Sequence, residues 1–379
     1  MKNILITGGA GFIGTHLALH LIQKGYRVRV LDNLSEQIHG KTPALGSPLY
    51  ASIKGKVDFI LGSVTSRTDL KRAIKDQQVI VHLAAETGTG QSMYQVEKYT
   101  QVNIQGTAIL LDILTNQPHQ VEKVVVASSR SIYGEGKYAS KESGVVYPAH
   151  RNDEDMKAGD FEVKYPGSGQ LELLATDESS KIHPSSVYGI TKQVQEQLVM
   201  NVCGALGIPA LAFRYQNVYG PGQSLSNPYT GILSIFSTRI RSGLPINIFE
   251  DGLESRDFVF ISDVVAATAA GIERDSGNNR VFNVGTGKAT NVLEVARSLM
   301  RAFNKEVPLE VSGMYRIGDI RHNYADVTLL RELLHVTPKV QFAEGIDQFV
   351  AWVKAQAACA SDYEGSLAEM QRRGLLKAG

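Results

Sequence analysis

Tyr188 and Lys192 are the side chains of this sequence best suited to move a proton. They stand four residues apart in SSVYGITKQVQEQLVM, so on a helix they share one face. A phenol has a pKa near ~10 and is a poor base at neutral pH. A neighbouring lysine ammonium favours the phenolate and lowers that pKa. The pair therefore predicts a proton acceptor for an alcohol that loses hydride to a nicotinamide cofactor.

The same Tyr-x-x-x-Lys spacing also occurs at Tyr50–Lys54, Tyr94–Lys98 and Tyr133–Lys137. The first of these pairs lies in a loop rich in proline and glycine. Two glycines interrupt the third pair, which disfavours a helix there. The pair Tyr94–Lys98 is compatible with a helix and is the alternative. Tyr188 is preferred because Ser185 is placed to cap a helix that continues well past Lys192.

The first 32 residues have the pattern of a dinucleotide-binding unit. A short apolar strand at 3–7 leads into a glycine-rich turn, and an amphipathic helix then runs to Gly25. A second strand at 27–31 ends in Asp32, about 20 residues after the glycines. Glycines allow the backbone to approach a pyrophosphate, and the carboxylate is expected to bind the adenine ribose hydroxyls. Because Asp32 would repel a 2′-phosphate, the sequence favours NAD over NADP.

Further apolar strands are predicted at 57–60, 79–83, 121–127 and 208–213, with helical stretches between most of them. This alternation predicts an α/β fold with a doubly wound parallel sheet of the Rossmann type and helices on both faces. The run VVVASSRSIYG at 124–134 delivers hydroxyl groups to the end of a strand. Because such sheets bind ligands at the carboxyl ends of their strands, Ser128, Ser129 and Arg130 are expected at the ligand site.

The composition argues against several other classes of protein. The 39 Lys and Arg residues nearly balance 38 Asp and Glu, so no nucleic-acid or membrane partner is expected. The cysteines, Cys203 and Cys359, form neither a disulfide framework nor a zinc-ligand spacing, and no metal site is expected. No apolar run approaches the ~18 residues of a membrane span, and the opening residues do not have the pattern of a signal peptide. A cytoplasmic protein of two or three domains is the expectation.

These motifs resemble those of the extended short-chain dehydrogenases/reductases of the nucleotide-sugar epimerase and dehydratase group. The resemblance follows the family's order along most of the chain, through TGGAGFIG at 7–14, HLAA at 82–85, NIQGT at 103–107, SSRSIYG at 128–134, YGITK at 188–192, RYQNVYGPG at 214–222, FEDGLESRDFVFISDV at 249–264, FNVGTG at 282–287 and YRIGDIRHNYAD at 315–326. It implies an NAD-dependent enzyme that acts on a nucleotide sugar. It also suggests a homodimer formed through two helices per subunit, near 95–116 and 187–206.

The resemblance implies roles for individual residues. Ser129 would complete a catalytic triad with Tyr188 and Lys192, and Lys192 would also hold the nicotinamide ribose. The implied cofactor-binding residues are Gly8, Gly11, Phe12, Ile13, Gly14, Asp32, Asn33, Ser63, Val64, Leu83, Ala84, Ala85, Thr87, Asn103, Tyr188 and Lys192. The implied substrate-binding residues are Gln91, Ser129, Arg130, Asn217, Phe249, Arg256 and Arg316, with Arg256 and Arg316 on the diphosphate. Ser63 and Val64 depart from the family, which usually has an acid there, near the adenine.

Arg130 bears on which reaction of the group is expected. Sugar dehydratases of the group have an Asp-Glu pair directly after the triad hydroxyl, whereas Arg130 and Ser131 stand there in this chain. Epimerisation at C4 needs no such acid and is favoured. The run HLAAETGTGQSM at 82–93 is similar to that of dTDP-L-rhamnose 4-epimerases, which make dTDP-6-deoxy-L-talose. The alternatives are a UDP-sugar 4-epimerase, another dehydratase or reductase of the group, and a non-catalytic NAD-binding protein.

The second half of the chain is expected to add a smaller α/β substrate-binding domain. The predicted NAD-binding domain spans 1–213 plus about 257–290, and the substrate domain spans 214–256 plus about 291–379. Residues 135–183 are predicted to be an insertion with a hairpin at 161–174, FEVKYPGSGQLELL, which could cover the sugar, serve an interface or be decoration. FAEGIDQFVAWVKAQ at 342–356 predicts an amphipathic helix that packs on the substrate domain.

Overall fold

Seven parallel strands form the central sheet of the computed structural model, which describes residues 2–229, 231–357 and 362–378. Their order across the sheet is β14 (Arg280–Val284), β9 (Ala210–Tyr215), β5 (Lys123–Ser129), β4 (Val79–His82), β1 (Asn3–Thr7), β2 (Arg27–Asp32) and β3 (Asp58–Leu61). The predicted doubly wound sheet is confirmed. The strand order reverses between β1 and β4, and a sheet of this kind offers a ligand crevice at such a point.

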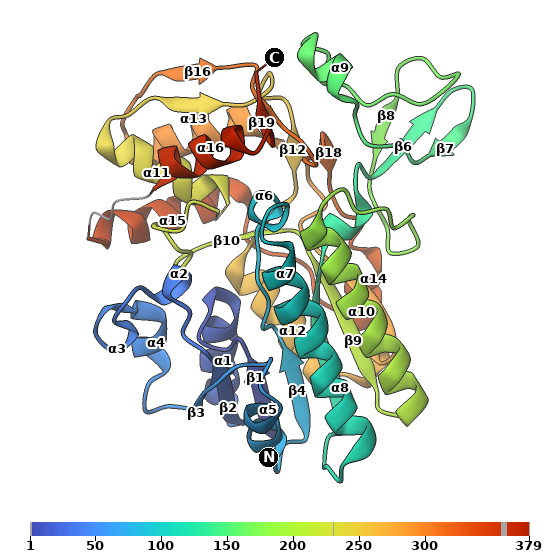
Figure 1. Cartoon of the computed structure of the whole chain (residues 1–379), viewed down its shortest axis with the longest axis vertical. Helices are drawn as coiled ribbons and strands as arrows, with labels where there is room; N and C mark the ends of the chain where they lie inside the picture. The colour runs from blue at the N-terminus through green and yellow to red at the C-terminus, as the bar shows by residue number, and fades with distance from the viewer. Residues whose placement is uncertain (1, 230, 358–361, 379) are drawn as a thin grey trace.

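Helices cover both faces of the sheet (Figure 1), which explains why its strands are apolar on both sides. On one face, Ile4 and Ile6 of β1 join the buried cluster that includes α1 (Phe12–Gln23) and α12 (Ile261–Glu273). On the other face, Leu5 joins the cluster that includes α5 (Arg67–Ile74), α8 (Gly106–Asn116) and α10 (Val187–Leu206). Successive strand residues alternate between the two clusters, as the period of two requires.

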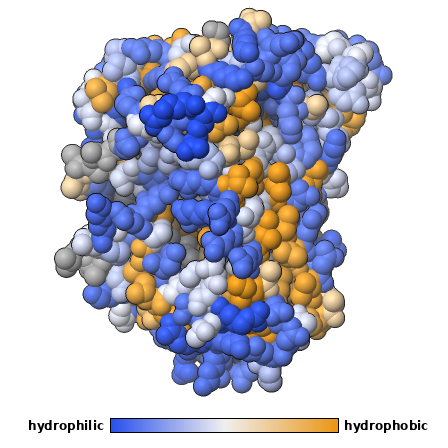
Figure 2. Space-filling model, in the orientation of Figure 1, coloured by the Kyte–Doolittle hydropathy of each residue, from blue (hydrophilic) through white to orange (hydrophobic). Residues whose placement is uncertain are grey.

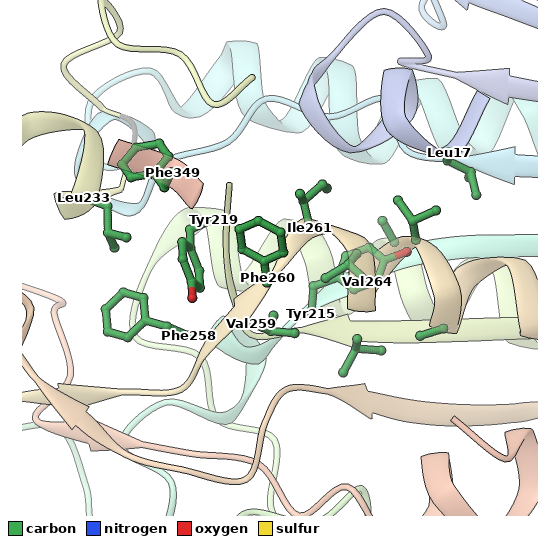
Figure 3. Close-up of a cluster of buried hydrophobic side chains, with 14 of the residues drawn as sticks. Leu17, Tyr215, Tyr219, Leu233, Phe258, Val259, Phe260, Ile261, Val264 and Phe349 are labelled. Atoms are coloured by element: carbon green, nitrogen blue, oxygen red, sulfur yellow. The ribbon is translucent and has the colours of Figure 1, made fainter. Parts of the chain in front are cut away.

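A second lobe follows the carboxyl ends of the strands. It contains the helices and paired strands α11 (Ile232–Ser242), α13 (Val292–Phe303), α15 (Phe342–Ala355), β11 (Ile246–Ile248) with β16 (Leu309–Val311), and β12 (Ser255–Arg256) between β15 (Thr290–Asn291) and β18 (His322–Asn323). The helix predicted at 342–356 is α15. Figure 3 shows the aromatic junction to the sheet, where Tyr219 lies among Phe258 and Phe260. These side chains come from β10 (Asn217–Tyr219) and β13 (Phe258–Phe260), which pair in parallel. The division into two domains stays a prediction.

The C-terminal segment returns across the second lobe. Helix α16 (Tyr363–Arg372) is followed by β19 (Leu376–Lys377), which pairs antiparallel with β17 (Tyr315–Arg316). The remaining short elements are α2 (Glu36–His39), α3 (Pro43–Gly46), α4 (Pro48–Ile53), α6 (Thr89–Ser92), α7 (Val96–Tyr99), the π-helix η1 (Thr100–Gln105), the 3-10 turns η2 (Arg130–Tyr133) and η3 (Asp275–Gly277), and α14 (Thr328–Leu334). No helix of the described residues is long and apolar enough to cross a membrane. Cys203 is buried and unpaired, whereas Cys359 lies outside the described residues.

The insertion at 135–183 differs from its prediction. Its hairpin joins β6 (Lys137–Ser140) to β7 (Gly144–Val146), and β8 (Glu172–Leu174) pairs with the other edge of β6. The predicted hairpin at 161–174 is wrong, because residues 161–164 form no strand. Their apolar side chains fill two small clusters instead, Val163 beside Tyr138 and Phe161 beside Met156 of α9 (Asp153–Lys157).

The start of α10 differs from the prediction by one residue. Ser186 caps the helix and accepts a hydrogen bond from the Gly189 amide at 3.1 Å. Ser185, the predicted cap, donates its hydroxyl to the Gly318 carbonyl at 2.8 Å and so ties α10 to the second lobe. Tyr188 and Lys192 lie on the first two turns of the 20-residue helix, as predicted.

Candidate active site

A cavity of about 580 Å³ opens at the carboxyl ends of β1, β2, β4, β5 and β9, below the second lobe. Almost all of the sequence-predicted site residues line it: Gly8, Gly11, Phe12, Ile13, Gly14, Asp32, Asn33, Ser63, Val64, Leu83, Ala84, Ala85, Thr87, Ser129, Arg130, Tyr188, Lys192, Asn217, Phe249, Arg256 and Arg316. Asn103 and Gln91 are not among the lining residues. Asn103 holds the Glu86 backbone and Thr191, and Gln91 bonds Gln37 and Tyr99. Both side chains therefore bond residues that line the cavity, Glu86 and Gln37, and do not line it themselves.

The glycine-rich turn between β1 and α1 fits the pyrophosphate of a dinucleotide. Gly8 has a φ of +68°, and a Cβ there would lie 2.8 Å from Ala84 Cα. A Cβ at Gly14 would lie 2.5 Å from the Gly8 carbonyl oxygen. The N-cap of α1 is Gly11, without a side-chain cap, so the first amides of the helix remain available to an anion. The turn thus has the close packing and the free donors that NAD requires.

Asp32 is held in place at the end of β2. Its Oδ2 accepts the Ala10 amide at 3.0 Å and its Oδ1 accepts the Leu34 amide at 2.8 Å. A carboxylate oxygen has two lone-pair sites, so each can still accept a ribose hydroxyl. His39, which the sequence analysis missed, lies with Nε2 3.9 Å from Asp32 Oδ1, and burial lowers its pKa. A neutral imidazole beside Asp32 is compatible with the predicted ribose site.

Ser129 and Tyr188 meet in the middle of the cavity wall. Ser129 ends β5, and its Oγ accepts hydrogen bonds from the Ser131 amide at 3.2 Å and the Ser131 hydroxyl at 2.8 Å. The Tyr188 amide donates to Ser92 Oγ at 3.0 Å, which fixes the first turn of α10. Burial raises the pKa of Tyr188, while a hydrogen bond to Ser129 and the charge of Arg130 oppose that rise. Among these protein groups alone, burial is the largest influence on the pKa of the phenol and favours its protonated form.

Lys192 ends a buried chain of polar side chains that begins at the first strand. Its Nζ donates to Gln195 Oε1, and Gln195 Nε2 donates to Thr107 Oγ1 at 2.9 Å. Thr107 Oγ1 lies 3.0 Å from His82 Nε2, and His82 Nδ1 lies 2.7 Å from Thr7 Oγ1. Burial lowers the pKa of Lys192 to about 7, and burial together with the Lys192 charge lowers that of His82 to about 3. Because this pKa is close to neutral pH, a small change in the surroundings of Lys192 changes the fraction of the lysine that is charged.

The alternative pair Tyr94–Lys98 does not form a unit. Tyr94 precedes α7 and its hydroxyl lies 2.5 Å from that of Tyr229, and burial raises its pKa. Lys98 points to Glu86 Oε2 at 3.1 Å. Neither residue is among those that line the cavity. This alternative does not form one helical face, because Tyr94 lies in a turn before α7 begins.

The second lobe contributes four charged residues from two segments. Arg256 Nη2 binds Asp319 Oδ1 at 3.0 Å, and Arg316 Nη2 binds Asp319 Oδ2 at 2.6 Å. The Arg316 guanidinium lies 5.4 Å from the centre of the Phe249 ring. Glu254 also lines the cavity, and burial with the nearby Glu250 raises its pKa to about 7. The second-lobe wall therefore has more positive than negative charge.

Helix α16 contributes wall residues that the sequence analysis missed, namely Tyr363, Ser366, Leu367 and Met370. Their spacing of three and four residues predicts one helical face, but no sequence signal shows what that face covers. None of residues 135–183, all of which the structure describes, lines the cavity, so the insertion does not cover it. Among the described residues, no group of three or more His, Cys, Asp or Glu side chains is placed to hold a metal ion.

A Rossmann-type sheet, a glycine turn with a following acid, and a Ser-Tyr-Lys group in one cavity fit the site of an NAD-dependent oxidoreductase. Residues 4–152 and 165–285 match the model of the NAD dependent epimerase/dehydratase family. The chain belongs to this family, and it is an NAD-dependent nucleotide-sugar epimerase/dehydratase enzyme. The interruption at 153–164 falls inside the insertion.

Similar proteins extend over nearly the whole chain. The dTDP-L-rhamnose 4-epimerase of Burkholderia thailandensis is 36% identical over 354 residues, 93% of this chain and 95% of the relative. The structure of a UDP-glucose 4-epimerase with UDP-glucose from Thermotoga maritima has a TM-score of 0.74 at 30% identity, and covers 93% of this chain and 98% of that one. The UDP-glucose 4-epimerase of Thermus thermophilus in complex with NAD has a TM-score of 0.73 at 26% identity, over 94% and 100% of the two chains.

Proposed function

We propose that this enzyme epimerises a nucleotide-activated hexose at C4, and that the substrate is dTDP-L-rhamnose. The observation that supports the reaction is the position of Ser129, Tyr188 and Lys192, which line one cavity together with the glycine turn and the second-lobe arginines. The absence of an acid directly after Ser129 supports epimerisation over dehydration. The choice of dTDP-L-rhamnose is supported by the relative that is 36% identical.

The triad residues each have a task in this reaction. Tyr188 removes the proton of the C4 hydroxyl, and Ser129 hydrogen-bonds the same oxygen. Lys192 holds the nicotinamide ribose and favours the Tyr188 phenolate by its charge. NAD, held by Lys192 and the glycine turn, would supply the hydride acceptor and donor for C4. Tyr188 then gives its proton back to the oxygen at C4.

The cofactor and the nucleotide occupy opposite sides of the cavity in this proposal. The turn from Gly8 to Gly14 binds the pyrophosphate of NAD, and Asp32 binds the adenine ribose. Arg316 binds the diphosphate of the substrate beside Phe249 and Asn217, and Arg256 adds its positive charge to the same wall. The hexose has to turn over between the two hydride transfers. A clamp on the diphosphate, away from the sugar, allows that rotation.

A UDP-sugar 4-epimerase is the second candidate, because the two solved structures described above are UDP-glucose 4-epimerases. Proton NMR of the purified enzyme with dTDP-L-rhamnose, without added cofactor, tests the proposal. UDP-glucose and UDP-N-acetylglucosamine serve as parallel substrates. We expect a new anomeric signal from the dTDP sugar alone, and about a thousandfold lower rate in Tyr188→Phe. Conversion of a UDP sugar alone would keep the reaction and refute the substrate.

A further inference from the structure

Arg130 presents unused hydrogen-bond donors to the cavity. It follows Ser129 at the end of β5, and its Nε donates to Asn217 Oδ1 at 2.9 Å. Among the described residues, no side chain and no carbonyl accepts a hydrogen bond from its Nη1 or Nη2. The bond to Asn217 fixes the orientation of the guanidinium plane. Its outer nitrogens are therefore held ready for a ligand.

Arg256, by contrast, is largely engaged within the protein. Its Nη1 donates to the carbonyls of Ser255 at 2.8 Å and Arg321 at 2.9 Å. Its Nη2 donates to Asp319 Oδ1 at 3.0 Å and to the Ile320 carbonyl at 2.6 Å. Arg256 thus contributes charge to the cavity but has few donors left for a ligand.

The charges around Arg130 are unbalanced. The charge of Arg256 repels it, and Asp319 is the carboxylate that attracts it most strongly, ahead of Glu135. Both oxygens of Asp319 are already bonded, one to Arg256 and one to Arg316. Burial and the charge of Arg256 lower the pKa of Arg130 to about 9. A positive group held in this way is stabilised by an anion that enters the cavity.

We propose that Arg130 binds the diphosphate of the nucleotide sugar from the side of the cavity that holds Ser129 and Tyr188. This inference rests on the proposed nucleotide-sugar activity. A guanidinium with two free terminal nitrogens suits a phosphoryl group, since it can donate two parallel hydrogen bonds. The position that has an acid in the dehydratases thus has a phosphate-binding residue in this chain. Arg130, more than Arg256, has the donors for that contact.

Calorimetric titration of the NAD-loaded enzyme with dTDP and dTMP tests this role. The two ligands differ in one phosphate, so the ratio of their affinities reports the contacts to that phosphate. We expect Arg130→Met to reduce the preference for dTDP over dTMP by ~10-fold or more, because a charge-assisted pair is lost. Arg130→Lys should retain part of the preference. Arg280→Met is the control, since Arg280 is exposed and does not line the cavity.

An unchanged ratio of the dTDP and dTMP affinities in Arg130→Met would overturn the proposal, whether both affinities fall equally or neither falls. Bound NAD and thermal stability of each variant show whether the fold is retained, and Arg130→Lys gives a second reading if the methionine variant is unstable. UDP and UMP are titrated in parallel, so the phosphate contact is tested whichever base the enzyme prefers. The NMR assay of epimerisation is independent of these titrations. An enzyme that epimerises no sugar but loses the diphosphate preference with Arg130 would refute the proposed function and retain this inference.

Discussion

At the residue scale, Lys192 bonds a buried neighbour that no motif marks. Gln195 is fully buried one turn further along α10, and its amide joins Lys192 to Thr107. Thr107 donates its hydroxyl to the Asn103 carbonyl at 2.6 Å, so it accepts from both Gln195 and His82. His82 is then protonated on Nε2 and neutral. Gln195 is the member of this chain that bonds the ammonium directly.

We predict that Gln195→Leu lowers kcat by about tenfold, because the buried ammonium loses one charge-assisted hydrogen bond. The pKa of Lys192, already about 7, falls further without this acceptor. At each pH above that lower pKa, a smaller fraction of Lys192 then carries its positive charge. The loss of rate should therefore be largest above pH 7 and shrink as the pH falls to 6. Steady-state rates over this pH range measure the effect.

Gln197→Leu is the matched control, because Gln197 is an exposed residue of the same helix. It should leave the pH profile unchanged. A deficit in Gln195→Leu that is the same at all pH values would show that Gln195 acts on the fold and not on the lysine charge.

The limits of sequence reading are also clear at this scale. Asp32, Ser129 and Tyr188 were predicted from spacing and context, and all three line the cavity. Gln91 and Asn103 were predicted as ligand contacts, yet their side chains bond other parts of the protein. Which way a side chain points in a loop or on a π-helix depends on its tertiary partners. Sequence spacing does not contain that information.

At the element scale, α16 is a structural cover of the cavity. Tyr363, Leu367 and Met370 pack with Phe249, which lines the cavity, and with Tyr94, which lies outside its lining. Arg373 lies 4.6 Å from the centre of the Tyr94 ring, and β19 pairs with the strand that contains Arg316. The segment therefore connects the turn that contains Tyr94 with the second lobe.

We predict that Leu367→Ala combined with Met370→Ala raises KM for the nucleotide sugar by roughly thirtyfold and changes kcat little. Two apolar side chains are removed from the wall, each worth about 1 kcal/mol or more against the ligand. Steady-state kinetics of the double variant measure KM and kcat separately. Arg372→Ala, on the exposed face of α16, is the control. A fall in kcat at unchanged KM would contradict a role in binding.

The insertion at 135–183 holds segments of the second lobe in place through buried ion pairs and hydrogen bonds. Arg151 binds both carboxylate oxygens of Glu250, at 2.8 and 2.9 Å, and also the Asp319 carbonyl at 3.2 Å. Fully buried Arg321 binds Glu162 of the insertion and Asp251. Both groups of contacts flank the segments that contain Phe249 and Arg316. The sheet and helices were predictable from apolar periodicity, whereas this network joins distant polar residues that have no periodic signal.

At the scale of the whole molecule, we propose a homodimer formed through α7–α8 and α10. These helices pack side by side, and Figure 2 shows apolar residues gathered over this face. Val96, Ile190 and Leu206 are 47%, 48% and 37% exposed. Exposed apolar residues that gather on two adjacent helices suit a second copy of the same chain.

Light scattering should give twice the 41.3 kDa of one chain. Val96→Glu should shift the protein towards a monomer, because a carboxylate would be buried at the contact. Val311→Glu is the control, since Val311 is similarly exposed at 54% but lies on β16. A monomeric wild type would refute the dimer and leave the site unaffected.

In the proposed reaction, the configuration at C4 is inverted by removal and return of the same hydride. The most direct measurement is NMR of dTDP-L-rhamnose labelled with deuterium at C4, incubated with the purified enzyme in ordinary water. We expect an epimerised product that retains the deuterium at C4, formed about a thousandfold more slowly by Tyr188→Phe. An epimerised product that has exchanged its C4 deuterium for solvent hydrogen would contradict it, because the hydrogen would then have left as a proton.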